Sequence, residues 1–90
     1  MSIVIQSKKE RLSPDVPYYQ FSEGWRALLQ RYNIGIEISE PDNLTKITVL
    51  TFPDQATLDA YQADPLVIKE MADSETYFSF AKIDKKVRQV

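Results

Sequence analysis

The stretch LTKITVLTFPDQATLDAYQADP, residues 44–65, indicates the fold more clearly than any other part of the chain. Its first nine residues are rich in β-branched and apolar side chains, which favours a strand from about Leu44 to Phe52. Pro53 and Asp54 end this strand, because proline cannot donate to the strand ladder. Asp54 is then well placed to cap a helix that begins immediately after it.

A second stop signal at Asp64 and Pro65 predicts that the helix ends and restarts there. Proline is favoured at the first position of a helix, and aspartate is a good cap before it. We expect the restarted helix to continue to about Ser74. The aromatic segment from Thr76 to Asp84 is then expected to form the last strand, with residues 85–90 as a polar tail or an extension of that strand.

The N-terminal half predicts one strand, one helix and a second strand. The β-branched run 3–5 begins a strand, and two prolines make residues 13–17 a loop. Ser22 is the expected helix cap. Alternating isoleucines at 34–38 predict a half-buried strand, and residues 40–43 have the composition of a hairpin turn. The apolar face of the helix consists of Phe21, Trp25, Leu28, Leu29 and Tyr32.

This order of strand, helix, strand, strand, helix and strand predicts a single α+β domain covering residues 1–90. Two right-handed crossovers joined by a hairpin give the ferredoxin-like βαββαβ arrangement. Its four-stranded antiparallel sheet has both helices on one face.

The second face of the sheet is also expected to be apolar. Leu50 and Phe52 point one way in the third strand, whereas Ile47 and Val49 point the other way. The predicted last strand alternates in the same manner, with Tyr77, Ala81 and Ile83 opposing Phe78 and Phe80. A large exposed apolar face marks an interface, so we expect a homodimer with sheets packed face to face. The alternative is that short strands curl and leave a few apolar side chains exposed.

The composition excludes several classes of function. The chain has no histidine and no cysteine, which rules out thiolate nucleophiles, zinc–thiolate sites and histidine bases or haem ligands. We therefore expect no metal and no cofactor. A net charge of −2 disfavours binding to nucleic acid, and no apolar run approaches the roughly 18 residues of a membrane helix. The expected location is the cytoplasm.

The segment 48–65, with Phe52, Tyr61, Asp64 and Pro65, resembles the dimeric α/β-barrel superfamily, which includes the antibiotic-biosynthesis monooxygenase-like proteins and small uncharacterised relatives. The resemblance covers the C-terminal half by these residues and the N-terminal half by topology. It implies a homodimer.

For the monooxygenases of this superfamily, the resemblance also implies a cofactor-independent oxygenase that uses a tryptophan and an asparagine beside a buried cavity. Trp25 is the only tryptophan, and Asn33 and Asn43 are the only asparagines. Both asparagines are expected at ordinary structural places, a helix end and a turn.

Trp25, Tyr32 and Tyr18 are the candidate ligand-binding residues, because they belong to an aromatic cluster across the loop and the first helix. Such a cluster suits a flat apolar ligand, and phenol groups can fix its orientation. The alternative is that these rings are plain core. The sequence thus favours a small homodimeric α/β-barrel protein that binds an apolar or aromatic molecule. A cofactor-independent monooxygenase-like enzyme and a structural or partner-binding module without catalysis are the alternatives.

Overall fold

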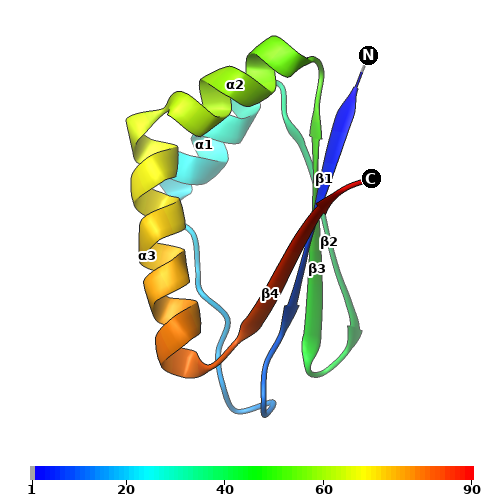
Figure 1. Ribbon diagram of the computed structural model, residues 1–90, viewed down its shortest axis with the longest axis vertical. Helices are drawn as coiled ribbons and strands as arrows, with labels where there is room; N and C mark the ends of the chain where they lie inside the picture. Colours follow the sequence, from blue (N-terminus) through cyan, green and yellow to red (C-terminus); the bar gives the residue numbers. More distant parts are fainter. Residues whose placement is uncertain (1) are drawn as a thin grey trace.

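A computed structural model describes residues 2–90, which form an α+β fold with a four-stranded antiparallel sheet (Figure 1). The strand order is β2-β3-β1-β4, and every neighbouring pair is antiparallel. The helices all lie on one face of the sheet, and the other face is open (Figure 1). In chain order the elements are β1 (Ile3–Glu10), α1 (Glu23–Arg31), β2 (Gly35–Asp42), β3 (Thr45–Phe52), α2 (Gln55–Ala63), α3 (Pro65–Ala81) and β4 (Asp84–Gln89).

The three helix starts predicted from the sequence are confirmed. Ser22 and Asp54 each accept a hydrogen bond from the backbone N–H three residues later, at 3.3 and 2.8 Å. Asp64 accepts one from the N–H two residues later at 2.9 Å, and Pro65 occupies the first turn of α3. The helical layer therefore contains three helices instead of two, because the chain breaks at Asp64 between α2 and α3.

The predicted end of α3 at Ser74 and the predicted strand from Thr76 to Asp84 are wrong. Helix α3 continues to Ala81, where Lys82 ends it in a left-handed conformation with φ 58°. The buried residues of α3 recur at helical spacing, at Val67, Glu70, Ser74 and Phe78. Two of these four are polar, so apolar periodicity alone did not reveal the stripe. Packing against the sheet thus overrides the strand preference of the aromatic segment.

The last strand is instead formed by the polar residues 84–89, which pair with β1 at the edge of the sheet. An edge strand rich in charged side chains is a common way to prevent unwanted pairing with another chain. No helix formed within residues 2–90 has the length and apolar character needed to span a bilayer.

Phe80 lies on the outer side of α3, where 84% of its surface is exposed. Because no core contact depends on it, we expect Phe80→Glu to leave the free energy of unfolding within about 0.5 kcal/mol of the parent. Thermal melts followed by circular dichroism check this. A fall in Tm large enough to indicate loss of core packing would show that Phe80 is covered in solution.

The open face of the sheet is less apolar than the sequence suggested. The strand register places three apolar side chains on this face, Val4, Ile47 and Val49. Val49 lies between Gln6 and Glu37 on the neighbouring strands, so polar and apolar side chains alternate. The prediction that Tyr77 to Ile83 contribute strand side chains to this face is wrong, because most of this segment is helical.

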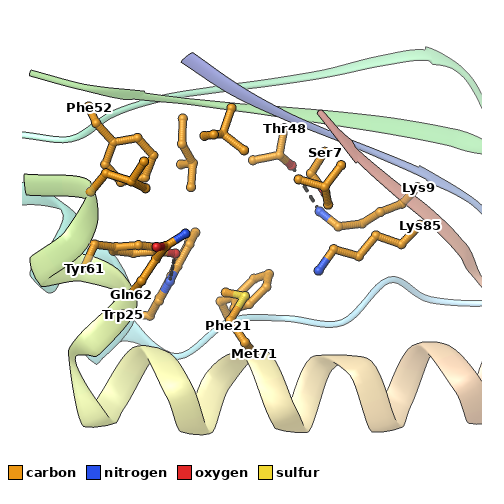
Figure 2. A pocket seen from close by; sticks show the side chains of 14 residues that line it. Ser7, Lys9, Phe21, Trp25, Thr48, Phe52, Tyr61, Gln62, Met71 and Lys85 are labelled. Carbon is orange, nitrogen blue, oxygen red and sulfur yellow. Dashed lines mark hydrogen bonds between the residues drawn. The ribbon is translucent and has the colours of Figure 1, made fainter. Parts of the chain in front are cut away.

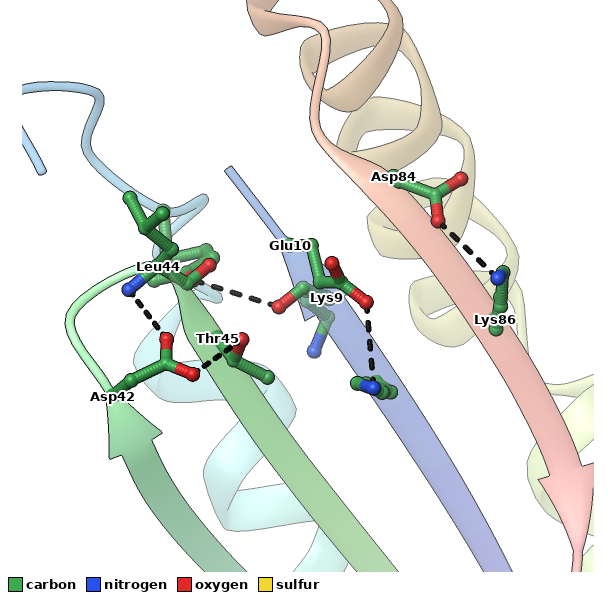
Figure 3. A network of polar contacts seen from close by, with 9 residues as sticks. Lys9, Glu10, Asp42, Leu44, Thr45, Asp84 and Lys86 are labelled. Atoms are coloured by element: carbon green, nitrogen blue, oxygen red, sulfur yellow. Dashed lines mark hydrogen bonds and ion pairs between the residues drawn. The ribbon is translucent and has the colours of Figure 1, made fainter. Parts of the chain in front are cut away.

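Ion pairs and a capped turn occupy the rest of the open face and the hairpin end (Figure 3). Glu10 lies 3.4 Å from the ammonium of Lys8, and Asp84 lies 4.0 Å from that of Lys86. Asp42 closes the β2–β3 hairpin by accepting hydrogen bonds from the backbone N–H of Leu44 at 2.8 Å and from the hydroxyl of Thr45. These hydrogen bonds lower the pKa of Asp42 below its ordinary value.

Candidate functional site

The helix-facing surface of the sheet is apolar at one end. The register pairs Ile3 with Phe52 and Ile5 with Leu50, so each pair forms a row across β1 and β3. Directly opposed residues of antiparallel strands point to the same face, which places these four side chains beneath the helices. This end belongs to the main hydrophobic core.

The same surface becomes polar two residues further along β1. Ser7 is opposed to Thr48 on β3 and to Val87 on β4. The next row contains Lys9, which is opposed to Lys46 on one side and to Lys85 on the other. We call these three residues the lysine row. Like charges placed directly opposite each other destabilise a sheet, so the row has a cost in stability.

A cavity of about 210 Å³ lies between this surface and the helices (Figure 2). Trp25, Phe52, Leu58 and Tyr61 line one end of it, and Figure 2 shows Phe52, Tyr61 and Trp25 together there. Lys9 and Lys85 extend into the opposite end, with Ser7 and Thr48 beside them (Figure 2). Apart from the amide of Gln62, which lies beside Tyr61, the first end of the cavity is apolar, and the opposite end is cationic (Figure 2).

Lys9 is the most unusual ionisable group of the cavity. Only 6% of its surface is exposed, and its Nζ donates a hydrogen bond to Thr48 Oγ1 at 3.3 Å. Lys9 forms no ion pair with any carboxylate in residues 2–90. Burial, and then the neighbouring charges of Lys46 and Lys85, lower the pKa of Lys9 from 10.5 to about 8.

Two further polar groups complete the cationic end. The ammonium groups of Lys9 and Lys85 lie 6.0 and 5.7 Å from the centre of the same Phe78 ring, within the range of cation–π attraction. Lys85 also forms an ion pair with Glu75 of α3 at 3.0 Å. The hydroxyl of Ser7 is buried and finds no hydrogen-bond partner among the described residues.

Trp25 and Tyr61 form the polar contact of the apolar end. The indole Nε1 of Trp25 donates to the hydroxyl of Tyr61 at 3.1 Å, and the indole ring stacks on Phe21 with centroids 4.4 Å apart. Trp25 is only 3% exposed. Burial raises the pKa of Tyr61 above its ordinary value, so its hydroxyl stays protonated at neutral pH. Trp25 is thus both a core residue and a wall of the cavity.

The structure brings together two of the three predicted ligand-binding residues. Tyr18 and Trp25 both line a second cavity of about 540 Å³, which lies between the loop before α1 and strands β2 and β3. The hydroxyl of Tyr18 donates to the carbonyl of Leu44 at 2.6 Å. Tyr32 is not among the residues that line either cavity, and its hydroxyl donates to Asp64 Oδ2 at 3.1 Å.

The two cavities are neighbours, since Lys9, Phe21, Trp25 and Thr48 line both of them. We regard the smaller one as the candidate site because it combines an apolar end with buried polar groups. The two asparagines lie outside both. Asn33 follows α1 with φ 56°, and Asn43 lies in the hairpin turn, where its carbonyl accepts two hydrogen bonds from Arg11.

The residues that the sequence analysis missed are Lys9, Ser7 and Lys85. A usable signal was present in β1, where the alternate positions Ile3, Ile5, Ser7 and Lys9 change from apolar to charged. Such a gradient along one face of a strand differs from the usual regular alternation. The contribution of Lys85 required the register of β4, which the sequence analysis had placed in the wrong segment.

No protein-family model and no curated protein matches the chain. Solved structures that are similar in fold include the following two. One is a crystal structure from Burkholderia cenocepacia, described provisionally as an amidohydrolase/peptidase, with a TM-score of 0.50 and 12% identity over 99% of this chain. The present chain spans 27% of that protein. The other is the de novo designed protein Foldit4, with a TM-score of 0.47 and 13% identity, covering 100% of this chain and 97% of the design. At these identities the likeness concerns the fold alone.

Proposed function

We propose that this protein binds a small apolar or aromatic molecule in the cavity between the sheet and the helices. The observation that carries this proposal is a cavity that is partly walled by Trp25 and Tyr61, two residues of the hydrophobic core. Protein interiors are normally close-packed, so a cavity with an aromatic wall and a few polar groups is a natural ligand site.

Trp25 provides the readout for this proposal, because it is the only tryptophan and lines the cavity. Hydrocinnamamide, a neutral one-ring amide, is a suitable probe. We expect it to change the fluorescence of Trp25 in a saturable manner and to raise the Tm, since a ligand that binds only the native state stabilises it. Acetamide is the control, because it lacks the ring.

A linear, non-saturating fluorescence change with an unaltered Tm would contradict binding in the cavity. A variant that fills the apolar end, Leu58→Phe, separates the cavity from surface sites. It should weaken hydrocinnamamide binding while the circular dichroism spectrum stays that of the parent. Unchanged affinity in a folded Leu58→Phe protein would place the probe elsewhere.

We also propose a ferredoxin-like βαββαβ fold of the dimeric α/β-barrel type, in which α2 and α3 together take the place of the second helix. The antiparallel order β2-β3-β1-β4 supports this arrangement. The homodimer would use the open face of the sheet, which carries Val4, Ile47 and Val49 and has no helix over it (Figure 1).

Sedimentation equilibrium at micromolar concentration tests the homodimer. We expect a species of twice the 10.4 kDa chain mass, and we expect Val49→Lys to shift it toward the monomer without loss of helix or strand signal. A parent protein that stays at 10.4 kDa would exclude this interface at such concentrations.

The oxygenase alternative is supported by the place of Trp25 in the cavity wall but not by the asparagines, which lie outside it. Consumption of oxygen in the presence of a quinol, absent in a folded Trp25→Phe variant, would favour it over simple binding.

A further inference from the structure

We propose that the ligand of this cavity is an organic anion, with an apolar or aromatic body against Trp25 and a carboxylate that Lys9 holds. This inference deepens the binding function proposed above and rests on it. It assigns a chemical class to the ligand.

The first support is the contrast between Lys9 and the lysines of the open sheet face. On the open face, Lys8 and Lys86 each lie within 4.0 Å of a carboxylate, that of Glu10 or Asp84 (Figure 3). On the helix-facing surface, Lys9 is far more buried and has no such partner in residues 2–90. A buried charge is costly unless it is paired, so this lysine has an unmet requirement for an anion.

The second support is the set of free donors at this end of the cavity. An ammonium group has three N–H donors, and that of Lys9 makes one hydrogen bond with a side chain, to Thr48. The hydroxyl of Ser7, one row away, is buried and has no partner in the described chain. A carboxylate has two oxygens that only accept hydrogen bonds, so it can satisfy both groups at once.

The third support is the charge that surrounds this point. Lys46 of β3 and Lys85 of β4 flank Lys9 in the lysine row. Helix α3 supplies two carboxylates nearby. Glu75 is bound to Lys85, and Glu70 accepts a hydrogen bond from the hydroxyl of Tyr19 at 3.2 Å.

Three cations therefore outnumber the two carboxylates by one, and the net positive charge beside the polar end of the cavity attracts anions. The position of both ammonium groups at one end and the aromatic rings at the other matches the shape of an arylalkyl carboxylate (Figure 2). The hydroxyl of the neighbouring Tyr18 donates to the backbone carbonyls of Leu44 and Lys9 and not to the Lys9 side chain, and burial raises the pKa of this phenol.

The test compares hydrocinnamate with hydrocinnamamide, which share the ring and chain and differ in charge. We expect calorimetric titration near neutral pH to give an affinity for the acid roughly 10- to 100-fold higher than for the amide, the range of a charge-assisted hydrogen bond. Lys9→Met should reduce this ratio to about one. Ser7→Ala should lower it in part, because it removes one donor. Lys8→Met, a matched change on the opposite face of the same strand, should leave it unchanged.

The pH dependence adds an independent readout. The preference for the acid should decline in the parent as pH rises above about 8, where Lys9 loses its proton, and should show no such decline in Lys9→Met. Equal affinities for acid and amide in the parent would overturn the inference while leaving the binding function intact. Binding of neither probe would overturn both. A preference for the acid that Lys8→Met abolishes and Lys9→Met retains would also overturn the inference, since it would place the anion on the open face.

Discussion

Trp25→Ala is expected to lower the free energy of unfolding by about 3–5 kcal/mol, the usual cost of truncating a large buried aromatic side chain. The indole is 3% exposed, stacks on Phe21 and donates to the hydroxyl of Tyr61. Its removal therefore enlarges the cavity and leaves that hydroxyl without its donor. In a domain with about 5–15 kcal/mol of total stability, a loss of this size unfolds a measurable fraction of the molecules.

Denaturant unfolding followed by circular dichroism measures this change, because the variant lacks the fluorescent probe. Trp25→Phe is the matched control, since it keeps a ring in contact with Phe21 and should cost less. If Trp25→Ala is as stable as the parent, then Trp25 serves only as a cavity wall and its packing contributes little to the fold.

Lys9→Met is expected to have the opposite effect and to stabilise the protein at neutral pH by about 1–3 kcal/mol. The pKa of Lys9 falls from 10.5 to about 8 in the folded chain. A shift of this size corresponds to about 3 kcal/mol of unfavourable free energy for the charged form. Methionine is of similar length and carries no charge, and replacing buried charges by well-packed apolar groups is often stabilising.

The sign of the pH dependence follows from the lowered pKa. Between pH 8 and pH 10.5 the unfolded chain holds the Lys9 proton and the native chain does not, so this group makes stability rise with pH in that window. Below about pH 8 the full cost is present in the native state. The difference in stability between Lys9→Met and the parent should therefore be largest near neutral pH and shrink toward pH 10.5.

Urea unfolding of both proteins across this range checks the prediction. Lys8→Met is the control at neutral pH. The side chain of Lys8 is 46% exposed, so its replacement should change the free energy of unfolding by only about 0.5 kcal/mol. A Lys9→Met protein that is less stable than the parent at neutral pH would show that the ammonium of Lys9 stabilises the fold. Lys9 would then not be an unpaired buried charge in the parent protein.

The sequence predicted the first three strands and all three helix starts because these depend on local signals. The isoleucines of β2, the β-branched run of β3 and the caps Ser22, Asp54 and Asp64 are such signals, although β2 is exposed along its length and not half-buried as expected. The boundary between α3 and β4 failed because the buried stripe of α3 includes Glu70 and Ser74, whose burial depends on tertiary contacts.

The site was predictable only in part. Trp25 stood out as the only tryptophan on an apolar helix face, and it does line the cavity. Lys9 looks like an ordinary solvated lysine next to Lys8. Strand alternation places the two on opposite faces, but only the position of the helices shows that the face of Lys9 is the covered one (Figure 1). Recognising the lysine row requires the register of β1, β3 and β4. A hydrophobic pattern does not determine this register when the last strand is polar.

The most direct test of the charged, two-ended cavity is a crystal structure of the protein with hydrocinnamate. We expect the ring to lie between Trp25 and Leu58, and one carboxylate oxygen to lie within hydrogen-bonding distance of Lys9 Nζ, about 2.7–2.9 Å. Hydrocinnamate bound on the open face beside Lys8, or seated in the cavity with its carboxylate turned away from Lys9, would contradict the account.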